Sequence, residues 1–87
     1  MEKDERIGVV THFYNKILVA VVRLTGRLAL GDRVRFHGEH TDFQQDITSM
    51  QIEHASVQEA APGTEVALKV TQRVRQGDGL YRPPSSA

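Results

Sequence analysis

The chain contains 87 residues, with no Cys, no Trp and 11 basic against 11 acidic side chains. A chain of this length forms one small domain that buries about 60% of its unfolded surface, too little core for a deep catalytic cleft with a lid. The lack of Cys excludes disulfides and thiolate metal sites, and a formal charge of zero argues against nucleic-acid binding through bulk positive charge.

The charge and hydropathy along the chain suggest a single soluble domain. Residues 1–6 are mostly charged, and the longest apolar run, residues 17–22, is far shorter than a bilayer span. We therefore expect no signal peptide, no membrane contact and a cytoplasmic location. The domain is predicted to cover residues 1–82, and residues 83–87 (Pro-Pro-Ser-Ser-Ala) a disordered tail.

Apolar residues follow the two-residue period of β-strands. Val34 and Phe36 alternate with polar neighbours, as do Val66, Leu68 and Val70 in a second segment. Residues 7–13 and 17–22 predict a hairpin with its turn at 14–16. Because residues 17–22 contain no polar position, this strand is expected to be covered on both faces.

The apolar phase breaks between residues 42 and 54, where the inward positions change from odd to even numbers. A bulge near Thr48 and Ser49 is the simplest explanation. Residues 56–59 have the spacing of a capping box, but Pro62 and Gly63 limit them to a loop or a single turn.

Three glycines each come with a small polar residue just before a predicted strand: Gly31, Gly63 and Gly77. Glycine adopts a positive φ without steric cost, so each pair predicts a turn that starts a strand. Three such turns favour an all-β fold closed into a small antiparallel barrel, which leaves no unpaired edges. The alternative is that Gly-Asp is simply a common turn.

Several segments together resemble the second domain of translational GTPases such as elongation factor Tu, and more narrowly the short translation elongation factor-like proteins. The segments are residues 7–17, 28–34, 49–54 (Ser-Met-Gln-Ile-Glu-His) and 60–70. The resemblance implies a six- or seven-stranded barrel of the elongation-factor domain 2 type that contacts tRNA, ribosomal RNA or a protein. A similar barrel also occurs at the end of some peptidase-like proteins that act in tRNA modification.

Catalytic and cofactor motifs are absent from the sequence. No Gly-rich loop ends in Gly-Lys-Ser/Thr, and Asn15-Lys16 is followed by Ile17 and Leu18 rather than by the guanine-reading pattern. The serines lack a nucleophile elbow, and the flavin motif of related barrels is missing. We therefore expect no GTPase or other enzyme activity and no nucleotide or other cofactor.

Charge is unevenly distributed along the chain. Residues 36–68 contain six acids and no Lys or Arg, and eight of the 11 basic residues are Arg, which suits phosphate contact. Opposite regions of the barrel are therefore expected to differ in sign. The candidate RNA-binding residues are Arg33, Arg35, Arg73, Arg75, Lys16 and Tyr14. The alternatives are that the arginines pair with acids at the surface and that, of the aromatic pair at the hairpin tip, Phe13 points inward and only Tyr14 is exposed.

Histidines give no specific metal motif. His37 and His40 are three apart at the expected tip of a strand-to-strand loop, and His12 and His54 could approach in space, but neither pair has ligand geometry. No metal site is predicted.

The sequence thus predicts a non-enzymatic binding module related to translation that contacts RNA, the ribosome or a translation protein. The alternative is a protein-binding scaffold, or a detached accessory domain that complements a separately encoded enzyme.

Overall fold

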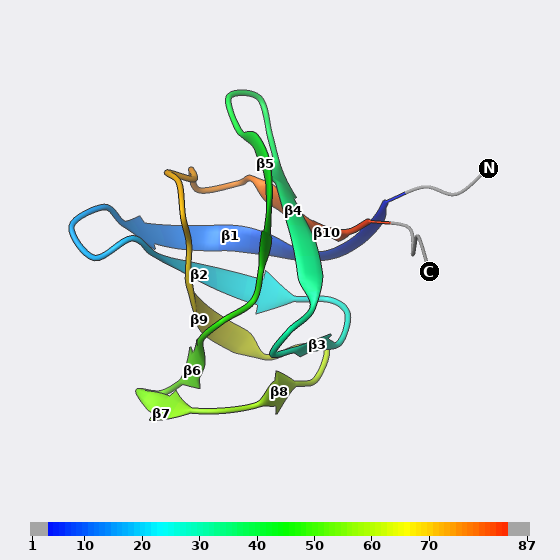
Figure 1. The fold of residues 1–87 in the computed structure, drawn as a ribbon, viewed down its shortest axis with the longest axis vertical. Helices are drawn as coiled ribbons and strands as arrows, with labels where there is room; N and C mark the ends of the chain where they lie inside the picture. The colour runs from blue at the N-terminus through cyan, green and yellow to red at the C-terminus, as the bar shows by residue number, and fades with distance from the viewer. Residues whose placement is uncertain (1–3, 84–87) are drawn as a thin grey trace.

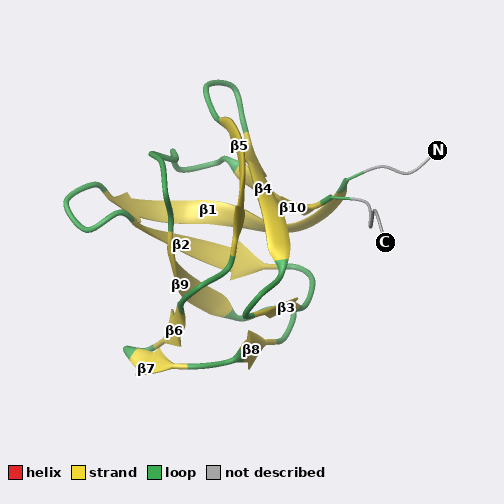
Figure 2. Ribbon diagram, viewed as in Figure 1, coloured by secondary structure: helices red, strands yellow, loops and turns green. Residues whose placement is uncertain are grey.

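The computed structural model describes residues 4–83, which form short β-strands and no helix (Figures 1 and 2). The strands are β1 (Glu5–Tyr14), β2 (Val19–Leu24), β3 (Leu28–Ala29), β4 (Arg33–His37), β5 (Asp42–Asp46), β6 (Met50–Ile52), β7 (Ala55–Ser56), β8 (Glu59–Ala60), β9 (Glu65–Lys69) and β10 (Gly79–Arg82). The all-β prediction is confirmed. Apart from Pro83, the predicted disordered tail lies outside the described residues.

Eight strands form one antiparallel sheet in the order β5-β4-β10-β1-β2-β9-β6-β7, and β3 and β8 form a separate two-stranded ribbon. The strand pairing among residues 4–83 therefore ends at β5 on one side and at β7 on the other, and these pairings do not close a barrel. Figure 1 shows that the sheet is strongly curled and that the chain runs from β5 directly into β6.

The core lies on the concave side of the curled sheet. Inward residues alternate along the strands as predicted: Ala20, Val22 and Leu24 on β2, and Val66 and Leu68 on β9. The buried apolar set is Ile7, Val10, Ala20, Val22, Leu24, Leu28, Val34, Phe36, Ile47, Met50, Ala60, Val66, Leu68, Val70, Val74 and Leu80. This burial holds the short strands together, since each buried large apolar side chain contributes about 1.5–3 kcal/mol.

The three predicted glycine turns are confirmed. Gly31, Gly63 and Gly77 have φ values of 89°, 88° and 95°, and they precede β4, β9 and β10. The acidic side chains that follow two of them stabilise the turn by accepting from backbone N–H groups three residues earlier. Asp32 accepts from Ala29 N at 3.0 Å, and the buried Asp78 accepts from Arg75 N at 2.8 Å.

The hairpin of β1 and β2 forms, but the prediction that residues 17–22 are a strand covered on both faces is wrong. Residues 15–18 are all turn, with Ile17 57% exposed and Leu18 at a φ of 53°. Val19 and Val21 are only half-buried. Their apolar side chains lie on the outer face of the sheet, which no other strand within residues 4–83 covers.

The predicted bulge near Thr48 and Ser49 is also wrong. The chain pairs with β4 up to Asp46, the last residue of β5, and pairs with β9 from Met50 onward. The break in the apolar phase therefore marks a change of strand partner. Both Ile47 and Met50 are buried across the break. The irregularities occur instead in β1, at residues 6–8 and 10–12. Residues 56–59 form no helical turn, and the segment contributes to the short strands β7 and β8.

Gln45 is a buried polar residue that the sequence analysis did not single out. Its side chain is 5% exposed, and its Nε2 donates to Lys69 O at 2.9 Å while its Oε1 accepts from Thr71 N at 2.9 Å. Gln45 therefore connects β5, at one end of the sheet, to the segment that leaves β9.

Candidate functional site

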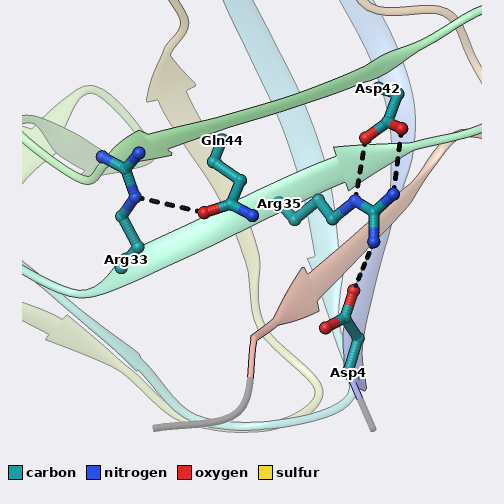
Figure 3. A network of polar contacts seen from close by, with 5 residues as sticks. All are labelled: Asp4, Arg33, Arg35, Asp42 and Gln44. Carbon is teal, nitrogen blue, oxygen red and sulfur yellow. Dashed lines mark hydrogen bonds and ion pairs between the residues drawn. The ribbon is translucent and has the colours of Figure 1, made fainter. Parts of the chain in front are cut away.

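Arg35 does not present a free guanidinium. Its Nε and Nη2 bond both oxygens of Asp42 at 2.8 and 2.9 Å, and its Nη1 bonds Asp4 Oδ2 at 2.9 Å (Figure 3). The bond to Asp42 raises the pKa of Arg35, and the same contact lowers the pKa of the Asp42 carboxyl. This arrangement fixes the segment before β1 onto the β4–β5 ladder and leaves little capacity for phosphate.

Substituting Arg35 by Gln is expected to reduce the stability of the domain in a pH-dependent way. Because Asp42 has a lowered pKa in the folded state, its contribution is complete above the ordinary Asp pKa of about 3.9 and disappears as the pH falls through the lower folded-state value. Urea midpoints of wild type and Arg35→Gln measured from pH 7 to pH 2 should converge at the acid end. Arg73→Gln, an exposed arginine, should change them little at any pH.

The expected separation of charges into opposite regions is wrong, because the acids of β5 face the arginines of β4. Arg33 lies opposite Asp46 in the ladder, with Nη1 3.2 Å from Asp46 Oδ1, and its Nε donates to Gln44 at 3.4 Å (Figure 3). Arg27 likewise pairs with Glu59 at 2.6 Å.

The other predicted contact residues occupy separate places. Arg73 and Arg75 are exposed in the loop between β9 and β10, whereas Lys16 is exposed in the β1–β2 turn. Arg33 and Arg35 lie on β4, where both are paired with acids. The role of the predicted residues in binding stays a prediction.

The two aromatic residues at the hairpin tip point to different sides of the sheet, as the alternative predicted. Phe13 packs against the core, and Tyr14 is 51% exposed, with its ring 6.0 Å from that of His12. His37 lies at the end of β4, and its ring is 6.2 Å from that of Tyr81. Among residues 4–83, no three His, Asp or Glu side chains are grouped so as to hold a metal ion, and no helix is long and apolar enough to cross a membrane.

A groove of about 670 Å³ lies on the outer face of the sheet. It extends over β2, β9 and β6, between the β1–β2 turn and the β6–β7 turn, both on the left in Figure 1. The residues that line it are Tyr14, Ile17, Val19, Val21, Gln51, Ile52, Glu53, His54, Thr64, Glu65, Val66 and Ala67. We refer to this feature as the groove.

Strand register explains how the groove acquires an apolar floor. Val21 lies opposite Ala67, which in turn lies opposite Gln51, so one row crosses all three strands. Val21 and Ala67 are both half-buried. Tyr14 and Ile17 extend this apolar floor at the hairpin end, and they are two of the three large apolar side chains exposed among the described residues. The third, Leu30, does not line the groove.

Backbone strain among residues 4–83 is concentrated at the two turns that border the groove. Leu18 in the β1–β2 turn, and Glu53 and His54 between β6 and β7, are the non-glycine residues with positive φ in this range, at 53°, 51° and 67°. The two-residue connection of β6 and β7 needs positive φ at both central positions, which normally favours Asn-Gly. Non-glycine residues at such positions cost about 1–2 kcal/mol each and recur at functional sites.

Replacing Glu53 and His54 by Asn and Gly is expected to raise the free energy of unfolding by about 1–2 kcal/mol, because both new residues accept the turn geometry. Chemical denaturation measures the change. Glu39→Asn, in the β4–β5 loop and without positive φ, serves as the control and should stay within about 0.5 kcal/mol of wild type. No gain for the double variant would show that the turn is unstrained.

The groove combines apolar and polar side chains. Val21 and Ala67 form an apolar row that ends at Gln51, and Glu53, His54, Thr64 and Glu65 add polar groups to its lining. Of the residues that line the groove, Tyr14 was predicted from the sequence as a contact residue and the others were not. The one available signal was the uninterrupted apolar run 17–22, which places apolar residues on the outer face of β2 as well as on the inner one.

Comparison with known proteins identifies relatives among peptidases. The chain is 38% identical over 76 residues to an uncharacterized protease of Methanocaldococcus jannaschii, a match that covers 86% of this chain and 19% of that protein. The chain thus spans about a fifth of the length of the curated relative it matches. No family model matches the sequence.

Two crystal structures of the C-terminal domain of a candidate U32 peptidase from Geobacillus thermoleovorans are similar in fold. One has a TM-score of 0.84 at 25% identity and covers 88% of this chain and 98% of that chain. The other has a TM-score of 0.85 at 24% identity and covers 93% of each.

These relatives overturn the assignment to elongation factor-like proteins. The predicted binding module of translation, with its contacts to tRNA, rRNA or the ribosome, is wrong, because the similar proteins are named as a protease and as the C-terminal domain of a peptidase. The alternative, an accessory domain of an enzyme, agrees better with them.

Proposed function

We propose that this chain is a non-catalytic accessory module of a U32 peptidase-type enzyme and docks on the body of that enzyme. The observation that supports this most is the pattern of coverage. The chain matches 19% of a named protease and 98% of a domain that was crystallised as the C-terminal part of a candidate peptidase. The module is thus similar to a unit that is attached to a larger enzyme.

The groove is the surface through which the module docks. Tyr14 and Ile17 expose apolar side chains next to the half-buried Val19 and Val21, and burying such surface releases about 25 cal/mol per Å². In this proposal catalysis belongs to the enzyme body, because the chain corresponds to only 19% of the named protease.

The curled sheet is held across its open side by Gln45, although its strand ladder does not close. Ile47 N donates to Asp32 O at 2.9 Å and Gly31 N donates to Ile47 O at 2.8 Å, which continues the β4–β5 ladder beyond Arg33 and Asp46. Gln45 makes the contact from β5 to the end of β9. This contact supports the sheet that carries the groove.

A domain exchange tests the function. In the Methanocaldococcus jannaschii relative, the matching 76-residue segment is deleted in one protein and replaced by the present chain in another. We expect the deletion to lower the melting temperature of the enzyme body and the replacement to restore it, because docking buries a surface on the body. Unchanged melting of the body in all three proteins would refute docking.

Two variants of the exchanged protein locate the docking surface. Ile17→Ser removes an apolar side chain from the groove, and Leu30→Ser removes one outside it. The Ile17→Ser protein should restore the melting temperature of the enzyme body less completely, whereas the Leu30→Ser protein should restore it as the unmodified exchange does. An equal loss of melting temperature in both variants would show that the module docks through another surface.

A further inference from the structure

From the charges along β9, we infer that the segment of the enzyme body that fills the groove is apolar and carries an Asp or Glu whose carboxylate pairs with Lys69. The inference rests on the proposed function and adds to it the chemistry of the partner. The residues that lead to it lie at the end of the groove formed by the β1–β2 turn and the end of β9 (Figure 1).

Lys69 stands directly beside the apolar lining of the groove. Val19 pairs with Tyr14 on one side and with Lys69 on the other, so one row of residues crosses β1, β2 and β9. The preceding residue of β9, Leu68, is buried, so Lys69 points to the outer face that Val19 also occupies. Residues opposite each other in such a ladder have Cβ atoms about 4.5–5.5 Å apart. Lys69 is therefore a close neighbour of a residue that lines the groove.

Lys69 has no acidic partner within the described part of the chain. No carboxylate of residues 4–83 lies within 4.0 Å of its ammonium. Its neighbours in the row, Val19 and Tyr14, are not acids. Lys16, exposed in the turn beside Ile17, likewise forms no ion pair in this range. This end of the groove thus has positive charge that residues 4–83 do not pair.

The acid at the opposite end of β9 has a different environment. Glu65 lies opposite Arg23 on β2 and accepts a hydrogen bond from the Thr11 hydroxyl at 3.2 Å. Glu65 and Lys69 are the two ends of a five-residue strand, about 13 Å apart at 3.3 Å per residue. Glu65 therefore has a donor and a facing cation of its own and is too distant to pair with Lys69.

Docking through the groove covers the row that contains Lys69. The position of Lys69 is fixed, because its backbone O accepts from Gln45 Nε2 at 2.9 Å. Removing an unpaired charge from water is costly, whereas a carboxylate placed against it offsets this cost. A matching segment therefore sets apolar side chains on Val19 and Val21 and a carboxylate beside them on Lys69.

Reversing the charge of Lys69 in the exchanged enzyme tests the inference, because the sign of the effect reports the sign of the charge that the body places there. The present chain inserted in the Methanocaldococcus jannaschii relative is compared with its Lys69→Glu variant. We expect the variant to recover less than about half of the increase in melting temperature, since two carboxylates then face each other. This difference should shrink as the salt concentration rises.

Two further variants show whether charge at this position is the cause. Lys69→Arg keeps the positive charge and should restore the melting temperature as the unmodified chain does. Arg73→Glu makes the same change of charge in the loop between β9 and β10, outside the groove lining, and should also restore it. Melting of each isolated variant is measured in parallel, so that lower stability of the module is not counted as weaker docking.

The possible results separate this inference from the proposed function. Full restoration by Lys69→Glu would show that docking uses no carboxylate at Lys69, and stronger restoration would show that the body presents a cation there. Either result, or an equal loss in Lys69→Glu and Arg73→Glu, would overturn the inference and leave the proposed function intact. If the unmodified chain itself restores nothing, the proposed function is wrong and the inference fails with it.

Discussion

Replacing Gln45 by Leu is expected to lower the free energy of unfolding by about 2–5 kcal/mol, the largest effect of any single polar substitution proposed for this domain. Leucine is similar in size but can neither accept from Thr71 N nor donate to Lys69 O. Each buried backbone group left unpaired costs about 1–3 kcal/mol. For a domain of this length, whose total stability is about 4–13 kcal/mol, the loss removes a large share.

Gln44→Leu is the matched control for this prediction. Gln44 is the adjacent residue of the same type on β5, but it is exposed, and among residues 4–83 its side chain has one hydrogen bond, the 3.4 Å contact from Arg33. Its substitution should change stability by no more than about 0.5 kcal/mol. Urea denaturation at neutral pH measures both variants. If Gln45→Leu is as stable as Gln44→Leu, Gln45 does not hold the curled sheet together.

Gly38→Ala is expected to destabilise the domain by about 1–3 kcal/mol. A Cβ on Gly38 would overlap Oδ1 and lie 2.7 Å from Cγ of the buried Asp78, well inside van der Waals contact. Gly38 does not have a positive φ, so alanine would otherwise gain about 0.4–1 kcal/mol from reduced flexibility of the unfolded chain. The steric clash is larger than this gain and decides the sign.

A double-mutant cycle with Asp78→Ala verifies the cause. The single variant Asp78→Ala loses the acceptor of Arg75 N and is itself less stable. In that background the added cost of Gly38→Ala should nearly vanish, because the clashing carboxylate is absent. A cost that stays the same in both backgrounds would show that Gly38 is needed for a reason other than its contact with Asp78.

Local conformation was largely predictable from the sequence. Alternating apolar residues identified β4 and β9, and the positive φ of Gly31, Gly63 and Gly77 followed from glycine chemistry. These features depend on neighbouring residues in the chain. The change of strand partner between Asp46 and Met50 was wrongly predicted as a bulge. Both a bulge and a change of partner shift the inward-facing positions by one residue, and only the identity of the paired strand distinguishes the two.

Long-range pairing was not predictable in the same way. Arg35 and Asp42 are seven residues apart, but whether they meet depends on the register of β4 with β5. The bonds of Gln45 to residues 69 and 71 depend on how the sheet curls. Likewise, the groove is lined by residues from three separate segments, within 14–21, 51–54 and 64–67, a set that no single stretch of sequence reveals.

The mistaken family resemblance has a similar origin. The segments quoted for it contain alternating core residues such as Val66 and Leu68 and the turn at Gly63, which serve packing and chain reversal. Such features specify a kind of β-fold and place no constraint on what its outer face binds. The arginines suggested RNA contact because of their residue type alone. Arg33 and Arg35 prove to be paired with acids.

Hydroxyl-radical footprinting of the exchanged enzyme tests the docking of the groove most directly. Oxidation of Tyr14 and Ile17 is compared between the isolated 87-residue chain and the same chain inserted in the Methanocaldococcus jannaschii relative, with Leu30 as the exposed apolar reference outside the groove. We expect Tyr14 and Ile17 to become several-fold less reactive in the enzyme while Leu30 stays unchanged. Equal reactivity of Tyr14 and Ile17 in the two proteins would contradict it.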